Sequence, residues 1–220
     1  MKPINTSREA LMMTLVLAPL LYLGISWNQL PTTMATQYDL QGNPTSWMPK
    51  ETTAVFIGAL SVLMYVLLRY LPRIDPTGNP QPGTYQKLRL VVTGMLACTL
   101  CWVIYVAVHS VGPRLSVNVL LVLISLLLAG MGNYLTTVKP NYFVGFRTPW
   151  TLHSDTVWRQ THQLGGRMLF GGGLLGVLLI LLVPAPYQMG TLMAIVLVTT
   201  ISPLVYSYVY FRREKAQRIN

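Results

Sequence analysis

The sequence predicts an all-α integral membrane protein, a six-transmembrane-helix bundle with a short interfacial helix before the fifth span. Composition and hydropathy lead to this class. Of the 220 residues, 52% are hydrophobic and only 10% are charged, whereas soluble domains carry about 25% charged residues. The mean hydropathy is +0.48. A helix needs roughly 20 mainly apolar residues to cross a bilayer, and six stretches of the chain meet that requirement.

The six expected spans follow the apolar runs in chain order. They cover residues 10–27, 52–71, 90–111, 115–138, 168–183 and 189–211. The first span follows basic residues, as a signal peptide does, but no small-x-small cleavage site ends it, so we expect it to be retained. Pro184 and Pro186 separate the last two spans, because proline removes a helix donor and Pro-x-Pro favours a turn.

The distribution of charge predicts the topology. Sixteen Lys and Arg against six Asp and Glu give a formal net charge of +10, which in a soluble protein would suggest nucleic acid. With the N-terminus inside, only Lys50 and Arg114 fall in outside loops, and this asymmetry is the positive-inside pattern. We therefore expect both termini in the cytoplasm, membrane lipids as partners and no direct contact with nucleic acid.

We expect a single membrane domain over residues 1–220. Within it, the first span and the outside loop form residues 10–51, and a cytoplasmic loop covers residues 139–167. Residues 72–85 are rich in Pro and Gly and predict a plain linker. Small residues four positions apart, including Ser125/Ala129 and Gly172/Gly176, predict close helix packing.

Patterns typical of catalysis do not occur in the chain. No acid falls near the middle of a span, where ion-coupled transporters and intramembrane proteases usually carry one, and no hydrolase, zinc-protease or nucleotide-binding motif is present. Cys98 and Cys101 lie in an apolar span, where we expect reduced, packed thiols. We predict no enzyme, no catalytic residue, no cofactor and no metal site.

The cytoplasmic loop is the only long stretch that is neither plainly apolar nor plainly a linker. Pro140 and Pro149 disfavour helix in the residues before them, and Gly145 allows a tight bend. We therefore expect residues 139–151 to form a stiff, non-helical segment at the membrane surface.

A short interfacial helix is expected next, over residues 155–163. Ser154 is a candidate N-cap, and Asp155 would complement the helix dipole in the first turn. Trp158 is typical of a side chain at headgroup level. Gly165 and Gly166 would end this helix before the fifth span.

Arg147 is the leading candidate for ligand binding in this loop. Its guanidinium could hold a phosphate or carboxylate at two points, or it could anchor the loop by pairing non-specifically with lipid phosphate. The other candidates also carry two interpretations, either partner binding or a structural role as an anchor, a backbone cap or a membrane-belt residue. The full set is Asn133, Lys139, Asn141, Gly145, Arg147, Thr148, Trp150, Trp158 and His162.

Two histidines and a carboxylate in the loop could in principle ligate a metal. These are His153, Asp155 and His162, but their spacing does not fix them on one helical face. We therefore predict no metal there, although an activity at the inner interface that uses these three residues stays open.

The loop closely resembles the signature of the SdpI-type toxin-immunity family of bacterial membrane proteins. In that family a Gly-Asn at the end of one span is followed by Lys-Pro-Asn-Tyr-Phe, Gly-x-Arg-Thr-Pro-Trp-Thr-Leu, Val-Trp-x-x-Thr-His and a Gly pair. The corresponding residues here are Gly132-Asn133, Lys139 to Phe143, Gly145 to Leu152, Val157 to His162, and Gly165-Gly166.

The outside loop resembles a second element of the same family. Relatives carry Leu-Pro, then a His-aromatic-Asn/Asp-x-x-Gly-x-Pro stretch and a Lys. This chain has Gln37 where relatives carry the His, and Thr45 where they often carry an acid. The residues that follow the pattern are Leu30-Pro31, Tyr38, Asp39, Gly42, Pro44 and Lys50. The candidates for contact with an external ligand are Tyr38, Asp39 and Asn43.

The resemblance implies a multi-pass protein of the bacterial cytoplasmic membrane that protects the cell from a secreted, membrane-active peptide toxin. It also implies a receptor role, in which the protein recruits a soluble transcriptional repressor to the membrane. The alternative function is a carrier or modifier of an anionic lipid at the inner leaflet, with Arg147 on the headgroup. The sequence does not predict an oligomeric state.

Overall fold

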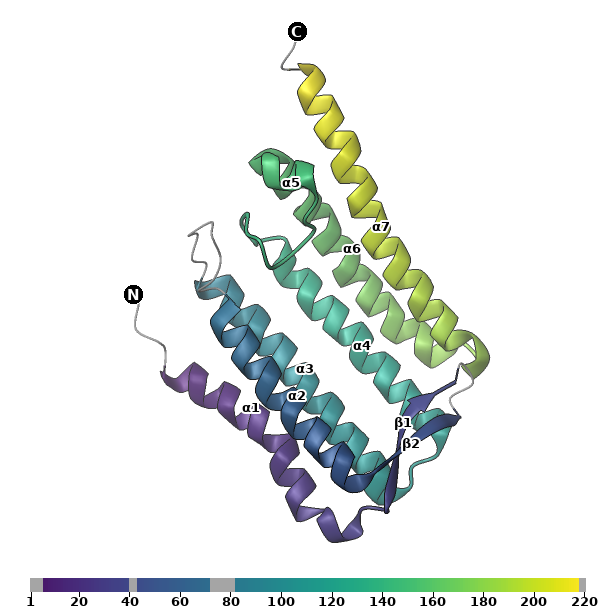
Figure 1. Ribbon diagram of the computed structural model, residues 1–220. Helices are drawn as coiled ribbons and strands as arrows, with labels where there is room; N and C mark the ends of the chain where they lie inside the picture. The colour runs from purple at the N-terminus through teal and green to yellow at the C-terminus, as the bar shows by residue number, and fades with distance from the viewer. Residues whose placement is uncertain (1–5, 40–42, 72–81, 218–220) are drawn as a thin grey trace.

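The computed structural model describes residues 6–39, 43–71 and 82–217, and in these ranges the protein is a helix bundle (Figure 1). Six of its helices are long and apolar enough to cross a membrane, which confirms the predicted class. They are α1 (Thr6–Ile25), α2 (Lys50–Tyr70), α3 (Pro82–His109), α4 (Pro113–Leu135), α6 (Asp155–Leu182) and α7 (Ala185–Gln217). The shorter elements are η1 (Trp27–Gln29), β1 (Thr33–Tyr38), β2 (Pro44–Pro49) and α5 (Pro149–His153).

Several helices extend beyond the apolar runs that predict them. The helix α3 begins at Pro82, inside the predicted linker, and α7 continues to Gln217. Hydropathy marks only the apolar part of a helix, whereas Arg, Lys, Glu and Gln extend it because they are good helix formers. Some expectations lie outside the described residues, namely those for Gly42 and for most of the 72–85 linker.

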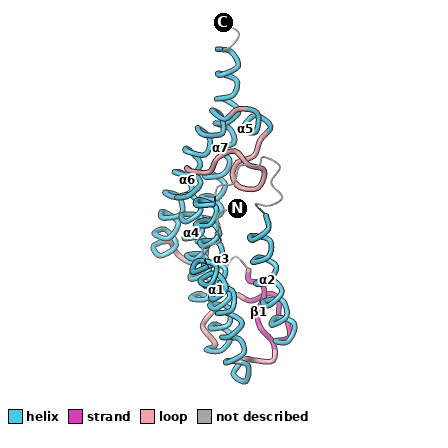
Figure 2. Tube along the Cα trace, turned by 90° about the vertical axis from the view of Figure 1, so that its left-hand side faces the viewer, coloured by secondary structure: helices cyan, strands magenta, loops and turns pink. Residues whose placement is uncertain are grey.

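The bundle has two halves that meet along α3 and α4. The helices α1, α2 and α3 form the first half, and α4, α6 and α7 form the second, in which α6 packs closely against both of its neighbours. Figure 2 shows α2 set apart from the second half. At one end of the bundle lie the start of α1, α5 and the end of α7, and at the other lie β1, β2 and the turn between α6 and α7 (Figure 1).

The backbones of α4 and α6 touch through glycine. A Cβ added at Gly173 would lie 2.5 Å from the Ala129 nitrogen and 2.5 Å from the Ser125 oxygen. At Gly176 an added Cβ would lie 2.8 Å from Ser125 Oγ, and at Gly172 it would meet Thr199 of α7. Small residues that allow backbones to approach are typical of helix pairs in membranes, so the predicted packing role of these residues is confirmed.

The short helix before the fifth span lies at Pro149–His153 and not at residues 155–163. Pro149 begins α5, because a missing N–H costs nothing at the first helical position. Residues 155–163 are instead the first turns of α6, which continues through Gly165 and Gly166. The expected break at these glycines is wrong, because both are buried against neighbouring groups, and that packing offsets the cost of about 1 kcal/mol per glycine in a helix.

A two-stranded antiparallel hairpin, which the sequence did not predict, occupies the loop between α1 and α2. Its register pairs Thr33 with Pro49 and Met34 with Met48. Met34 is 2% exposed and packs with Ile57, Leu100 and other buried side chains of α1 to α3. The hairpin therefore covers the end of the first half of the bundle.

Candidate functional site

Asn141 organises the loop between α4 and α5. Its Oδ1 accepts the backbone N–H groups of Phe143 at 2.8 Å and Val144 at 2.7 Å. Its Nδ2 donates to the carbonyls of Lys139 at 2.9 Å and Val144 at 3.2 Å. The side chain is 8% exposed, and its amide is fully used inside the loop. The geometry gives Asn141 the capping role rather than the ligand-binding one.

His162 fixes the next part of the loop through a hydrogen bond with the backbone of Phe146. Its Nε2 accepts the backbone N–H of Phe146 at 3.0 Å, so the other nitrogen, Nδ1, carries the proton and donates to the Trp158 carbonyl at 2.8 Å. Gly145 lies directly over the ring with φ = +110°, where any Cβ would collide with the imidazole. The residue at 145 therefore has to be glycine for two reasons, conformation and space.

Trp158 is a packing residue in this arrangement. It is 1% exposed, and its ring stacks on His162 with the centroids 3.9 Å apart. Its indole N–H donates to the Val138 carbonyl at 2.8 Å. The ring joins a buried cluster with Leu135, Val138, Val144, Phe146 and Leu169. This burial fits neither a membrane-belt residue nor an open platform for a ligand.

Capping hydrogen bonds fix the bend from the loop into α5 and α6. Thr148 caps α5 in a reciprocal pair with Thr151, in which the Thr151 N–H donates to Thr148 Oγ1 at 3.2 Å and the Thr148 N–H donates to Thr151 Oγ1 at 2.8 Å. Ser154 caps α6 by accepting the Val157 N–H, as the sequence predicts. The expected capping roles of Thr148 and Ser154 are thus both present.

The helix α5 also connects the segment of residues 139–167, called the signature loop below, to α7. The Trp150 indole N–H donates to Ser207 Oγ at 2.5 Å, and its ring packs edge-on against Tyr208. Ser154 Oγ donates to Glu214 Oε2 at 2.8 Å. His153 meets Phe211 of α7 edge-on, whereas His162 lies under the loop, so the two histidines serve different contacts.

The remaining candidates of the loop face outward. Asn133, Lys139 and Arg147 are exposed, as are Arg159 and Arg167 beside them. The Arg147 guanidinium donates to the backbone carbonyl of Tyr142, so the loop holds this side chain in place while leaving it open to solvent. Tyr142 itself is 47% exposed. The structure thus separates the signature into buried residues that build the loop and outward-facing residues that other molecules can reach.

On the opposite end of the bundle, two of the three outside candidates close the hairpin. Asp39 Oδ1 accepts the Asn43 backbone N–H at 2.7 Å, and Asp39 Oδ2 accepts from Asn43 Nδ2 at 3.2 Å. Burial raises the pKa of the Tyr38 phenol above its ordinary value. Trp47 is the large exposed side chain here, at 59% exposure.

A partly buried ionic cluster joins α1, α2 and α3, and it consists of Glu9, Tyr65, Arg69 and Arg89. Arg89 donates to both Glu9 oxygens, at 3.1 Å and 3.0 Å, and the Tyr65 hydroxyl donates to Glu9 Oε1 at 2.5 Å. Arg69 pairs with the same oxygen and lies 2.9 Å from the Tyr65 hydroxyl. This cluster is not predicted from the sequence, because Glu9 lies at the start of a span and not near its middle, and Arg69 and Arg89 were interpreted only as charges that set the topology.

Comparison with known proteins points to one family. Residues 137–207 match the model of the SdpI/YfhL protein family, and residues 14–71 match that of a domain of unknown function, DUF1648. The chain is 23% identical over 195 residues to the immunity protein SdpI of Bacillus subtilis (strain 168), across 88% of this chain and 91% of that protein. These similarities support an SdpI-type protein. No solved structure gives a significant match to the chain.

The two matched regions of the SdpI-type chain fall in different halves of the bundle. Residues 14–71 cover most of α1, the hairpin and α2, and residues 137–207 cover the signature loop, α5, α6 and most of α7. The similarity supports a toxin-immunity family of multi-pass membrane proteins.

Proposed function

We propose that this protein protects its bacterial host from a secreted, membrane-active peptide toxin, without catalysis. The observation that carries the proposal is the similarity to the immunity protein SdpI along 88% of the chain. The internal roles of Asn141, Gly145 and His162 also support it, since they explain the signature as the framework of a shaped loop.

We propose further that the protein lies in the bacterial cytoplasmic membrane with both termini and the signature loop inside the cell. The charge distribution supports this orientation. The exposed cations Arg8, Lys87, Arg147 and Arg159 belong to the bundle end that carries the loop, whereas Lys50 and Arg114 belong to the hairpin end. The hairpin would then face the medium from which a toxin arrives.

The hairpin is the proposed contact surface for the toxin, through Tyr38, Asp39, Asn43 and Trp47. Asp39 and Asn43 are hydrogen-bonded to each other, so substitution of either residue would also disturb the turn of the hairpin. Trp47 gives a cleaner test because it is 59% exposed, and a broad aromatic ring suits contact with an apolar peptide.

The signature loop is the proposed contact surface for a partner inside the cell. Its outward-facing residues, Tyr142, Arg147 and Arg159, offer an aromatic ring and two cations on a scaffold that the buried residues fix. A soluble transcriptional repressor recruited to this surface would make the protein a receptor as well as a protective factor.

A survival assay tests the proposal, with a deletion strain complemented by wild type, Trp47→Ala or Tyr187→Ala and challenged with secreted peptides. Tyr187 is the control because it is an aromatic side chain, 67% exposed, at the same end of the bundle. We expect Trp47→Ala to lower the tolerated toxin concentration about tenfold, as expected for the loss of about 1.4 kcal/mol of binding free energy. Tyr187→Ala should protect fully. A deletion strain that tolerates every peptide tested contradicts the proposal.

The second candidate function is a carrier or modifier of an anionic lipid at the inner leaflet. The exposed guanidinium of Arg147, held by the Tyr142 carbonyl, favours it because such a group can bind a lipid phosphate at two points. If this function is correct, we expect lipid phosphate to co-purify with the wild type and with Arg159→Ala, but not with Arg147→Ala. Protein that carries no lipid phosphate and transfers no lipid between vesicles excludes this function.

A further inference from the structure

The helix α1 bends where Pro19 lies inside the bundle (Figure 1). Proline has no backbone N–H, so the carbonyl of Leu15, one turn earlier, loses its usual helical donor. Pro19 is among the fully buried residues. In a span of this kind no solvent is at hand to replace the missing donor, so the bend needs another group that can donate to Leu15.

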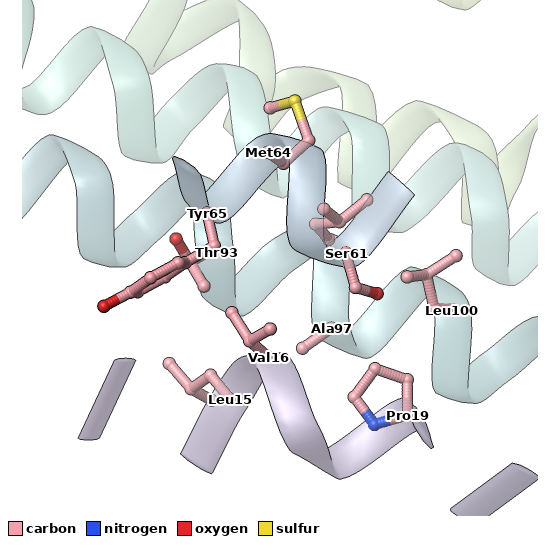
Figure 3. A pocket seen from close by; sticks show the side chains of 10 residues that line it. Leu15, Val16, Pro19, Ser61, Met64, Tyr65, Thr93, Ala97 and Leu100 are labelled. Carbon is pink, nitrogen blue, oxygen red and sulfur yellow. The ribbon is translucent and has the colours of Figure 1, made fainter. Parts of the chain in front are cut away.

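Ser61 of α2 faces the same place with an unused hydroxyl. It is 2% exposed, and its Oγ has no hydrogen-bond partner among the described residues. Other hydroxyls in these helices behave differently. Those of Thr14, Thr99 and Ser125 donate to the carbonyl four residues earlier, at 3.0, 2.8 and 2.9 Å. Figure 3 shows the Ser61 hydroxyl on the side of α2 that faces Pro19 and Ala97.

A small cavity lies between these groups, where α1, α2 and α3 meet. Leu15, Pro19, Ser61, Thr93 and Ala97 are among the residues that line it (Figure 3). The space open to the centre of a water molecule is about 10 Å³, close to the minimum that one bound water needs. The cavity is therefore too small for a lipid chain or a peptide side chain and matches a single water.

We propose that this cavity binds one ordered water molecule that joins α1 to α2. The water accepts a hydrogen bond from the Ser61 hydroxyl and donates one to the Leu15 carbonyl. Thr93, on the third helix, lines the same space and offers a further polar atom. A buried water usually makes two to four hydrogen bonds, and this site supplies them in an otherwise apolar interior.

The alternative is a dry cavity, and the polar groups disfavour it. Cavities that stay empty are lined by apolar atoms alone, whereas this one is lined by Ser61, whose buried hydroxyl has no partner among the described residues, and by Leu15, whose carbonyl loses its helical donor to Pro19. Leaving both groups unpaired would be costly in a medium without solvent. The bound water would hold the bend and keep the start of α1 directed so that Glu9 meets Arg89. This inference does not depend on the proposed function.

The first test is a crystal structure of the wild-type protein in lipid at a resolution that shows ordered water, with a second crystal under xenon pressure. We expect a peak within hydrogen-bond distance of both Ser61 Oγ and the Leu15 oxygen, and no xenon there. Xenon in the cavity, or no peak in it, overturns the proposal.

The second test is a double-mutant cycle on Ser61→Ala and Pro19→Ala, with thermal midpoints measured in lipid nanodiscs. The first variant removes the partner of the water on α2, and the second restores a donor for Leu15. A shared water couples the two positions although the side chains share no direct hydrogen bond, so we expect the double variant to differ from the sum of the single shifts. Additive shifts overturn the proposal. The control pair, Ser125→Ala with Pro19→Ala, should be additive because the Ser125 hydroxyl is already bound to Leu121.

Discussion

At the scale of single residues, the signature loop shows what sequence can predict of a site. The sequence singled out Asn141, Gly145 and His162 as candidates with two interpretations, either partner binding or a structural role. Their buried contacts show that they build the loop. Spacing could not reveal this, because the His162–Phe146 contact joins a helix to a loop sixteen residues away, and only the folded chain brings the two together.

Gly145→Ala should separate the signature loop from the His162 ring. The substitution forces a Cβ against the His162 ring and a side chain into a φ of +110°, so we expect a loss of about 2 kcal/mol in the free energy of unfolding, and loss of protection with it. Chemical denaturation in detergent measures the first effect. Gly190→Ala is the control, because a Cβ there meets nothing within 4 Å. If both variants unfold like the wild type, the loop does not depend on this contact.

At the scale of elements, packing explains where prediction failed. The sequence placed a helix end at Gly165 and Gly166, because glycine weakens an isolated helix. In the bundle, those glycines instead let α6 lie against its neighbours. The hairpin was missed for a related reason, since its strands are short and depend on burial of Met34 against helices far away in sequence. The six spanning helices were predictable, because each rests on a local apolar run.

Substitution by leucine should destabilise the protein at Gly173 of α6 but not at Gly171 of the same helix. Gly173→Leu inserts a side chain where Ala129 and Ser125 lie within 2.5 Å of an added Cβ, whereas Gly171 has nothing within 4 Å. We expect Gly173→Leu to separate α4 from α6 and to lower the thermal midpoint by several degrees or prevent accumulation of the folded protein. Gly171→Leu should leave the midpoint close to that of the wild type. Equal effects of the two substitutions would show that α4 does not pack on this face of α6 in the membrane.

At the scale of the whole molecule, an even number of spans brings both described ends of the chain to the bundle end that carries the signature loop. The hairpin lies at the other end. The six spans follow from composition, but the way they sort into two halves does not, because α1 and α3 are tied through Glu9 and Arg89 across eighty positions. A protein of this plan offers one surface to the medium and a different one to the cell.

Cysteine labelling tests the predicted orientation. In a background with Cys98 and Cys101 replaced, Thr45→Cys on the exposed face of β2 should react with a membrane-impermeant maleimide on intact cells. Arg147→Cys should react only after the cells are opened, because positive loops stay inside. Both positions are exposed in the fold, so access to the side chain itself does not limit the reaction. The reverse pattern would invert the topology and exchange the roles proposed for the two surfaces.

The hydrogen bond from Phe146 to His162 has a practical consequence for spectroscopy. The chain has only three histidines, so isotope-labelled histidine gives a nuclear magnetic resonance spectrum with few ring signals. His162 alone has its Nε2 fixed as the acceptor of a loop amide, and its nitrogen shifts therefore report one tautomer for as long as the loop is seated. Adding a toxin or a cytosolic protein to the labelled sample would then show, from a single ring, whether binding on either side of the membrane reaches this loop.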